Sequence, residues 1–123
     1  MTETLDTEVV SQLIAGDTHE LKPVTIPSGA GALSRGTVLG MLTADFTFDQ
    51  FDQDDATYGL NTARAILAED VDATSSAVVA QAYVLGKFRS EDLIWPSDIT
   101  NAEKQAALLN LQDRGIVVDT DWA

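Results

Sequence analysis

GKFRSEDLIWP, residues 86–96 of a 123-residue chain, joins an aromatic side chain, an arginine, two adjacent carboxylates, a tryptophan and a proline. These groups could form a charged site beside an apolar pocket, or the polar edge of a packing motif. Catalysis would need a nucleophile or a base close by, and the segment supplies only Ser90. We therefore interpret the segment as a packing corner, held by Arg89 with Glu91 or Asp92.

The residues on both sides of this corner fit the same interpretation. The apolar and β-branched run at residues 77–85 predicts a buried strand, which Gly86 ends. Phe88 continues from it toward the corner. Trp95 then folds back as a plug, and its single N–H donor needs a partner where it is buried. Pro96 stops strand hydrogen bonding and prepares the helix that follows.

Residues 100–114 carry a full set of helix signals. Thr100 and Glu103 match the T-x-x-E capping box, and Gly115 stands where a C′ glycine belongs. We expect one apolar face of this helix to pack on the core. The side chains that share or flank that face are Ala102, Ala106, Leu108, Leu109 and Leu111.

The remaining pattern predicts short strands joined by turns. Expected strands cover residues 21–26, 36–42, 62–67 and 116–118, with a further strand that begins near residue 45 and runs into an exposed acidic loop. Gly40 marks a bulge or a close approach of the backbone. Turns are expected at residues 27–31 and 70–76. Residues 62–70 would also suit a helix.

Together these elements predict a mixed α/β protein of the α+β class. It should be a compact, β-rich single domain over residues 21–123, with one C-terminal helix and a flexible N-terminal arm over residues 1–20. The hydrophobic fraction of 45% is typical of a globular chain, and no cysteine is available for a disulfide or a thiolate metal site. We expect no transmembrane helix and no secretory signal.

The arm has an unusual composition. It holds five acidic residues and no Lys or Arg, so it is weakly structured when alone. One small apolar patch interrupts the charges. The patch consists of Val9, Val10, Leu13 and Ile14, which are the candidate residues for binding a partner.

No other segment makes a convincing site. Residues 49–55 lack the glycine and glutamate spacing of a calcium loop, and the acids at 69–72 lie among turn residues. His19 is the only histidine and has no plausible partner in the sequence. No phosphate-binding glycine loop is present. We therefore expect no catalytic residue, no metal and no cofactor.

The spacing G-x-F-R-x-E-D-x-x-W-P resembles the head decoration protein family of bacteriophage lambda. A following helix and a closing Ile-x-Val strand are also similar, so the resemblance covers roughly residues 60–118. The chain departs from the lambda protein in a longer helix region, in a tail after the last strand and in the arm. The matching residues are Gly86, Phe88, Arg89, Glu91, Asp92, Trp95 and Pro96.

This resemblance implies a capsid-stabilising protein without catalysis or cofactor. Members of the family form trimers on the outside of the expanded head, at its three-fold and quasi-three-fold positions. They clamp neighbouring capsomers against the pressure of packaged DNA, and their arm pairs with strands of the major capsid protein. On this reading the corner is scaffold and the arm carries the contact.

Two other classes of function remain open from residues alone. A net charge of −13 argues against gripping a phosphate backbone or an anionic membrane, but it would suit an acidic DNA mimic that inhibits a nucleic-acid enzyme. A small enzyme that uses the carboxylates of residues 69–72 is a weaker alternative. The resemblance implies a virion protein on the outer surface of the capsid, and a chain without cysteine suits synthesis in the host cytoplasm.

Overall fold

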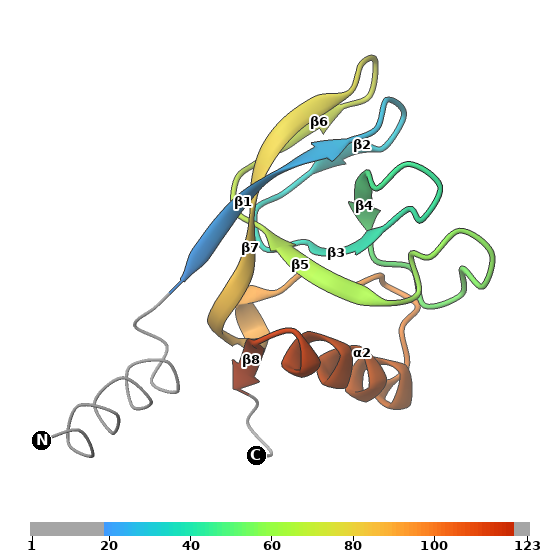
Figure 1. Cartoon of the computed structure of the whole chain (residues 1–123). Coiled ribbons are helices and arrows are strands. Elements are labelled where there is room, and N and C mark those ends of the chain that lie inside the picture. The colour runs from blue at the N-terminus through green and yellow to red at the C-terminus, as the bar shows by residue number, and fades with distance from the viewer. Residues whose placement is uncertain (1–18, 120–123) are drawn as a thin grey trace, which may run out of the picture.

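A computed structural model describes residues 19–119, so the arm patch Val9, Val10, Leu13 and Ile14 and the tail after Asp119 lie outside the described residues. The elements in chain order are β1 (Glu20–Ile26), β2 (Gly31–Leu33), β3 (Val38–Met41), β4 (Phe48–Gln50), β5 (Ala63–Leu67), β6 (Val71–Ala73), β7 (Val78–Arg89), a 3₁₀ turn (Ser90–Asp92), α2 (Asn101–Asp113) and β8 (Ile116–Asp119). Figure 1 shows that residues 19–119 form a β-rich unit with α2 near its C-terminal end, which confirms the predicted α+β class. Among these residues no helix is both long and apolar enough to cross a membrane.

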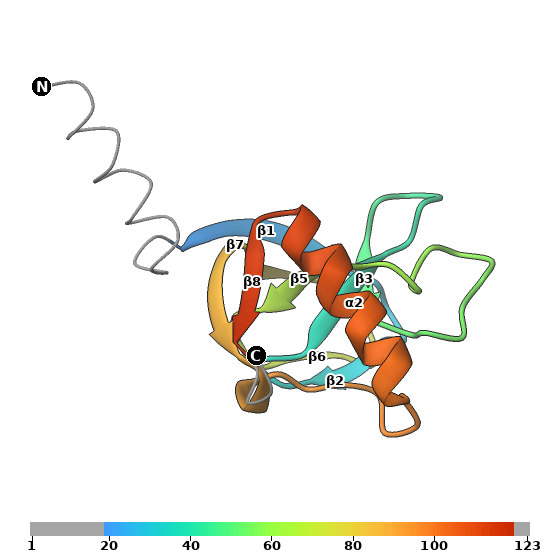
Figure 2. The same cartoon turned by 90° about the horizontal axis from the view of Figure 1, so that it is seen from below.

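The main sheet is built around the long strand β7. Its strand order is β1-β7-β5-β3-β4, all antiparallel, and β8 adds a parallel partner to the end of β7. Strands β2 and β6 form a separate antiparallel pair at the opposite end of the molecule from α2 (Figure 1). The helix packs on β5 and β8, as both views show (Figures 1 and 2).

Two apolar clusters hold these layers together, because successive strand residues point to opposite faces. Val38 and Ile66 enter one cluster, while their neighbours Leu39 and Leu67 enter the other. The buried members on the side of β2 and β6 are Val24, Ile26, Leu33, Leu39, Ala65, Leu67, Ala73, Ala80 and Ala82. Those on the side of α2 are Val38, Phe51, Ala63, Ile66, Leu93, Ala107, Leu111 and Ile116.

The helix begins as predicted but buries a different face. Thr100 and Glu103 form the reciprocal capping box, with N–O distances of 2.9 and 3.2 Å between the side chains and the backbone nitrogens. Gly115 follows with φ +92°, as a C′ glycine should. The expected core face was wrong, since Ala102, Ala106 and Leu109 are exposed. Apolar residues occur on every side of this helix, and the sheet selects the side that it covers.

That selected side consists of Ala107 and Leu111, which are the buried residues of α2. They lie four positions apart and therefore on one stripe of the helix. Both belong to the cluster that includes Ile116 of β8 and Ala63 of β5. The helix thus closes the lower side of the sheet with only a narrow apolar contact.

Strand β7 does not end at Gly86 as predicted, but runs on to Arg89. The parallel strand β8 provides the reason, because Gly86 pairs with Ile116 and donates its N–H to the carbonyl of Gly115 at 3.3 Å. A partner strand thus compensates for the low strand propensity of glycine. The bulge expected at Gly40 is confirmed by a register shift beside it, where an added Cβ would lie 2.7 Å from the carbonyl oxygen of Leu60.

Two loop predictions also need correction. The connection at residues 70–76 contains the short strand β6, which pairs with β2. Conversely, the strand expected from residue 45 begins only at Phe48, because the preceding residues form a turn. Phe46 lies in that turn with φ +62°, in the left-handed region that side chains seldom adopt.

Candidate functional site

The corner at residues 86–96 lies where β7 leaves the sheet. Arg89 and Glu91 form an ion pair, and both side chains are exposed, by 72% and 56%. Asp92 is exposed as well and takes no part in that pair. An exposed pair of this kind contributes only about 0–1 kcal/mol. The charged residues of the corner therefore face solvent.

The chain after the corner is fixed by its backbone. Ile94 accepts from the N–H of Val38 and donates to the carbonyl of Gly36, at 3.2 and 2.9 Å. Leu93 is buried next to them in the second cluster. An added Cβ on Gly36 would lie only 2.5 Å from the carbonyl oxygen of Asp92, so the two segments touch directly. This contact ties the corner to the start of β3.

Trp95 covers the edge of the second cluster. Its ring meets the buried ring of Phe51 edge to face at 5.9 Å between centroids, and Lys104 of α2 lies over it at 5.8 Å. Both geometries are favourable for an aromatic ring. Its indole Nε1 is buried without a hydrogen-bond partner among residues 19–119. Pro96 follows half-buried, and its carbonyl accepts from Ile99 at 3.2 Å just before α2.

His19 lies packed against β7, a contact that the sequence did not predict. Its ring contacts those of Tyr83 and Phe88, with centroids 5.7 and 5.6 Å apart. Its Nε2 lies 3.4 Å from the carbonyl oxygen of Lys87, 68 positions further along the chain. The antiparallel pairing of β1 with β7 creates this contact, because Glu20 is paired with Leu85.

Gly86 leaves the space that His19 occupies. An added Cβ at Gly86 would lie 2.5 Å from the Cδ2 atom of the imidazole. The glycine also has φ +146°, which disfavours any side chain. The motif glycine is thus explained by the approach of the first described residue of the chain. We call His19, the first described residue, the root of the arm. The corner and the root of the arm form one structural unit.

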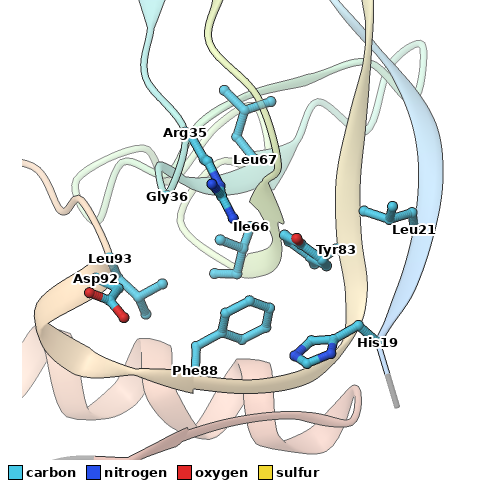
Figure 3. A pocket seen from close by; sticks show the side chains of 10 residues that line it. All are labelled: His19, Leu21, Arg35, Gly36, Ile66, Leu67, Tyr83, Phe88, Asp92 and Leu93. Carbon is cyan, nitrogen blue, oxygen red and sulfur yellow. The ribbon is translucent and has the colours of Figure 1, made fainter. Parts of the chain in front are cut away.

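An open hollow of about 740 Å³ borders this unit. Figure 3 shows the side chain of Ile66 facing the aromatic rings of Tyr83 and Phe88 across it. Arg35 points into it from the loop after β2. Sequence inspection could not find this hollow, because its lining comes from segments far apart in the chain.

The acidic side chains at residues 69–72 accept hydrogen bonds from backbone N–H groups. Glu69 accepts from the N–H of Gln81 at 2.8 Å, Asp70 from that of Arg35 at 2.7 Å, and Asp72 from the N–H and hydroxyl of Thr74. These hydrogen bonds to Thr74 lower the pKa of Asp72. The three carboxylates thus bind three separate backbone sites instead of forming a catalytic pair.

The acids at residues 49–55 behave in two ways. Asp55 accepts from the N–H groups of Tyr58, Leu60 and Thr57, and these bonds lower its pKa. Partial desolvation and the nearby charge of Asp98 raise the pKa of Asp54. Across residues 19–119 no three His, Asp or Glu side chains gather in a way that could hold a metal ion.

Comparison with known proteins identifies the class. The family model of the bacteriophage lambda head decoration protein D matches residues 8–116, which is most of the chain. The chain therefore belongs to the lambda head decoration protein family, as the motif at residues 86–96 indicated. A search of curated proteins found no match. Family membership makes the chain a structural protein of the phage head that binds the capsid.

Proposed function

We propose that this protein is a cementing protein that binds the outside of the expanded head as a trimer. There it stabilises the shell against the internal pressure of the packaged DNA. The single observation that carries the proposal is the family match over residues 8–116, which takes in the arm patch as well as the corner. Synthesis in the host cytoplasm suits a chain without cysteine.

The trimer is the working unit of this proposal. A ring closed by three-fold symmetry presents three copies of every contact in one geometry, which suits a three-fold position of an icosahedral shell. Three subunits would bring together three chains that each carry a formal charge of −13. Their mutual contacts should therefore be apolar or charge-paired, because like charges repel at short range.

The arm is the main capsid contact in this proposal. Ordering a backbone costs roughly 1–2 kcal/mol per residue, so a bound arm must recover that free energy from added hydrogen bonds and apolar burial. Pairing of the arm with a strand of the major capsid protein would supply the hydrogen bonds. The patch Val9, Val10, Leu13 and Ile14 would supply the apolar contact.

The contacts of His19 suit this role because they fix where the arm starts. The ring packs against the rings of Tyr83 and Phe88 and occupies the space that Gly86 leaves free. A fixed starting point gives three arms of one trimer defined directions. After the first arm binds, the others then act at a raised effective concentration.

A binding experiment tests the proposal. Purified protein is added to undecorated heads of the matching phage, in expanded and unexpanded form, and bound protein is measured by sedimentation. We expect saturable binding to expanded heads and retained integrity of these heads under conditions that break undecorated ones. Equal binding to unexpanded heads, or none to either form, would refute a decoration role.

A further inference from the structure

Two loops project together at one end of the molecule, and we call residues 43–47 and 52–60 the loop edge. The first loop joins β3 to β4, and the second joins β4 to β5. Figures 1 and 2 both show them side by side, on the opposite side of the molecule from the start of β1. The root of the arm and the loop edge thus lie at two separate ends of the molecule.

Each loop presents one aromatic side chain to solvent. Phe46 is 70% exposed and Tyr58 is 64% exposed, although large aromatic rings usually cover a core. Phe46 also occupies the left-handed region with φ +62°, where glycine or asparagine would be expected. The fold therefore holds an exposed phenylalanine at a position where its backbone is unfavourable and its side chain packs little.

The loop edge is held in place by hydrogen bonds before any partner arrives. The carbonyl of Tyr58 accepts from the backbone N–H and the hydroxyl of Thr43, at 3.0 and 3.3 Å. Asp55 fixes the same loop through the N–H groups of Thr57, Tyr58 and Leu60, at 3.0–3.1 Å. Aromatic anchors on a preorganised support lose little conformational entropy on binding, which is typical of interface hot spots.

The charge around the loop edge defines its partner. Residues 36–63 contain five aspartates and no Lys, Arg or His. A second copy placed edge to edge would bring two such acidic surfaces together, which like-charge repulsion opposes. A protein surface with an apolar depression would receive the aromatic rings. Lys or Arg at the border of that depression would be complementary to the aspartates.

We propose that the loop edge is a second capsid contact, in which Phe46 and Tyr58 enter an apolar depression of the major capsid protein bordered by Lys or Arg. This inference rests on the proposed function. A second contact on each subunit, separated from the arm, would add to the three arms of the trimer in clamping neighbouring capsomers. The arm serves one point, and the loop edge at the other end of the molecule serves the second.

Full-length variants test the contact directly. In one variant Phe46→Ser and Tyr58→Ser are combined, and the matched control is Val79→Ser, which changes a residue that is 67% exposed on β7. Sedimentation titrations with undecorated expanded heads give the apparent Kd of each protein. We expect at least a tenfold weaker Kd for the double variant and an unchanged Kd for the control, with unchanged melting temperatures and trimer mass.

The outcomes separate this inference from the function on which it rests. Unchanged binding of the double variant, beside a wild type that decorates heads, overturns the inference alone. Conversion of the double variant to monomers also overturns it, because the edge would then be a subunit contact. A wild type that fails to bind heads refutes both.

A charge variant tests the nature of the partner. Asp45→Asn with Asp54→Asn removes two charges from the loop edge and keeps an acceptor oxygen for the hydrogen bonds that Asp45 receives from Thr47. We expect weaker binding to heads at low salt and a smaller loss of affinity as salt is raised. An unchanged dependence on salt would overturn the assignment of a basic partner surface.

Discussion

Trp95 is the residue of the corner at residues 86–96 whose energetic role can be isolated by substitution. It is half-buried over Phe51, and its Nε1 has no acceptor among residues 19–119. We expect Trp95→Ala to destabilise the fold by less than the about 3–5 kcal/mol typical of a fully buried aromatic residue. Trp95→Phe keeps a ring on Phe51 and removes the unpaired donor, so it should cost much less. Urea unfolding of both variants measures the difference.

The control for this comparison lies on the wet side of the same corner. Glu91→Ala breaks the exposed ion pair with Arg89 and should cost about 0–1 kcal/mol. A loss for Glu91→Ala as large as that for Trp95→Ala would contradict the assignment of packing to the tryptophan. Unchanged stability of Trp95→Ala, together with lost capsid binding, would move Trp95 from scaffold to binding surface.

Phe46 permits the opposite prediction for stability. A left-handed conformation costs a side-chain-bearing residue about 1–2 kcal/mol, whereas glycine adopts it freely but loses more backbone entropy on folding. Because Phe46 is mostly exposed, Phe46→Gly forfeits little packing. We expect an equal or higher melting temperature with weaker head binding. A clear fall in melting temperature would mean that the ring stabilises the fold.

At the scale of elements, Asp55 determines the shape of the second loop. Its pKa is lowered by the N–H groups of Tyr58, Leu60 and Thr57, so the folded state favours the charged carboxylate. That contribution to stability is present above the usual carboxyl pKa of about 3.9 and is lost as pH falls through the lower folded pKa. Asp55→Ala should therefore be less stable than wild type at neutral pH. Urea midpoints of the two proteins should converge on acidification, and a constant gap would contradict this.

The arm is predicted to be needed for binding to heads and not for folding. Deleting residues 2–18 should leave melting temperature and trimer mass nearly unchanged but weaken head binding severely. Val10→Asp with Leu13→Asp should do the same, because the apolar patch is lost. The matched control, Thr4→Asp with Thr7→Asp, adds the same charge outside the patch and should bind far better. Full binding by the truncated trimer would place the contact on the globular domain.

Helices and strands could be predicted from the sequence where neighbouring residues alone determine them. The capping box of Thr100 and Glu103 fixes the start of α2 from four residues, so the sequence alone reveals it. Strand β6 was missed because Val71 is the only β-branched residue in a strand that lies among turn-forming residues, and its partner β2 lies about forty positions earlier. The contact of His19 with Phe88 was missed for a similar reason, since only the pairing of β1 with β7 creates it.

The whole molecule combines a small folded domain with two candidate capsid contacts, the arm patch and the loop edge. The motif at residues 86–96 indicated the family that the match over residues 8–116 shows, and its corner contacts β3, the helix and His19 in this chain. The contacts that would engage a capsid were only partly visible in the sequence. Composition alone reveals the apolar patch in the acidic arm. Phe46 and Tyr58 stand out as candidate contacts only because the structure shows that both are exposed and that Phe46 has a positive φ.

Imaging of decorated heads by electron cryomicroscopy tests the central claim most directly. Purified protein is added to undecorated expanded heads of the matching phage, and the density is compared with that of the bare shell. We expect trimers on the outer surface at the three-fold and quasi-three-fold positions, with the arm on the major capsid protein. Density absent from these positions, or single subunits scattered over the shell, would contradict it.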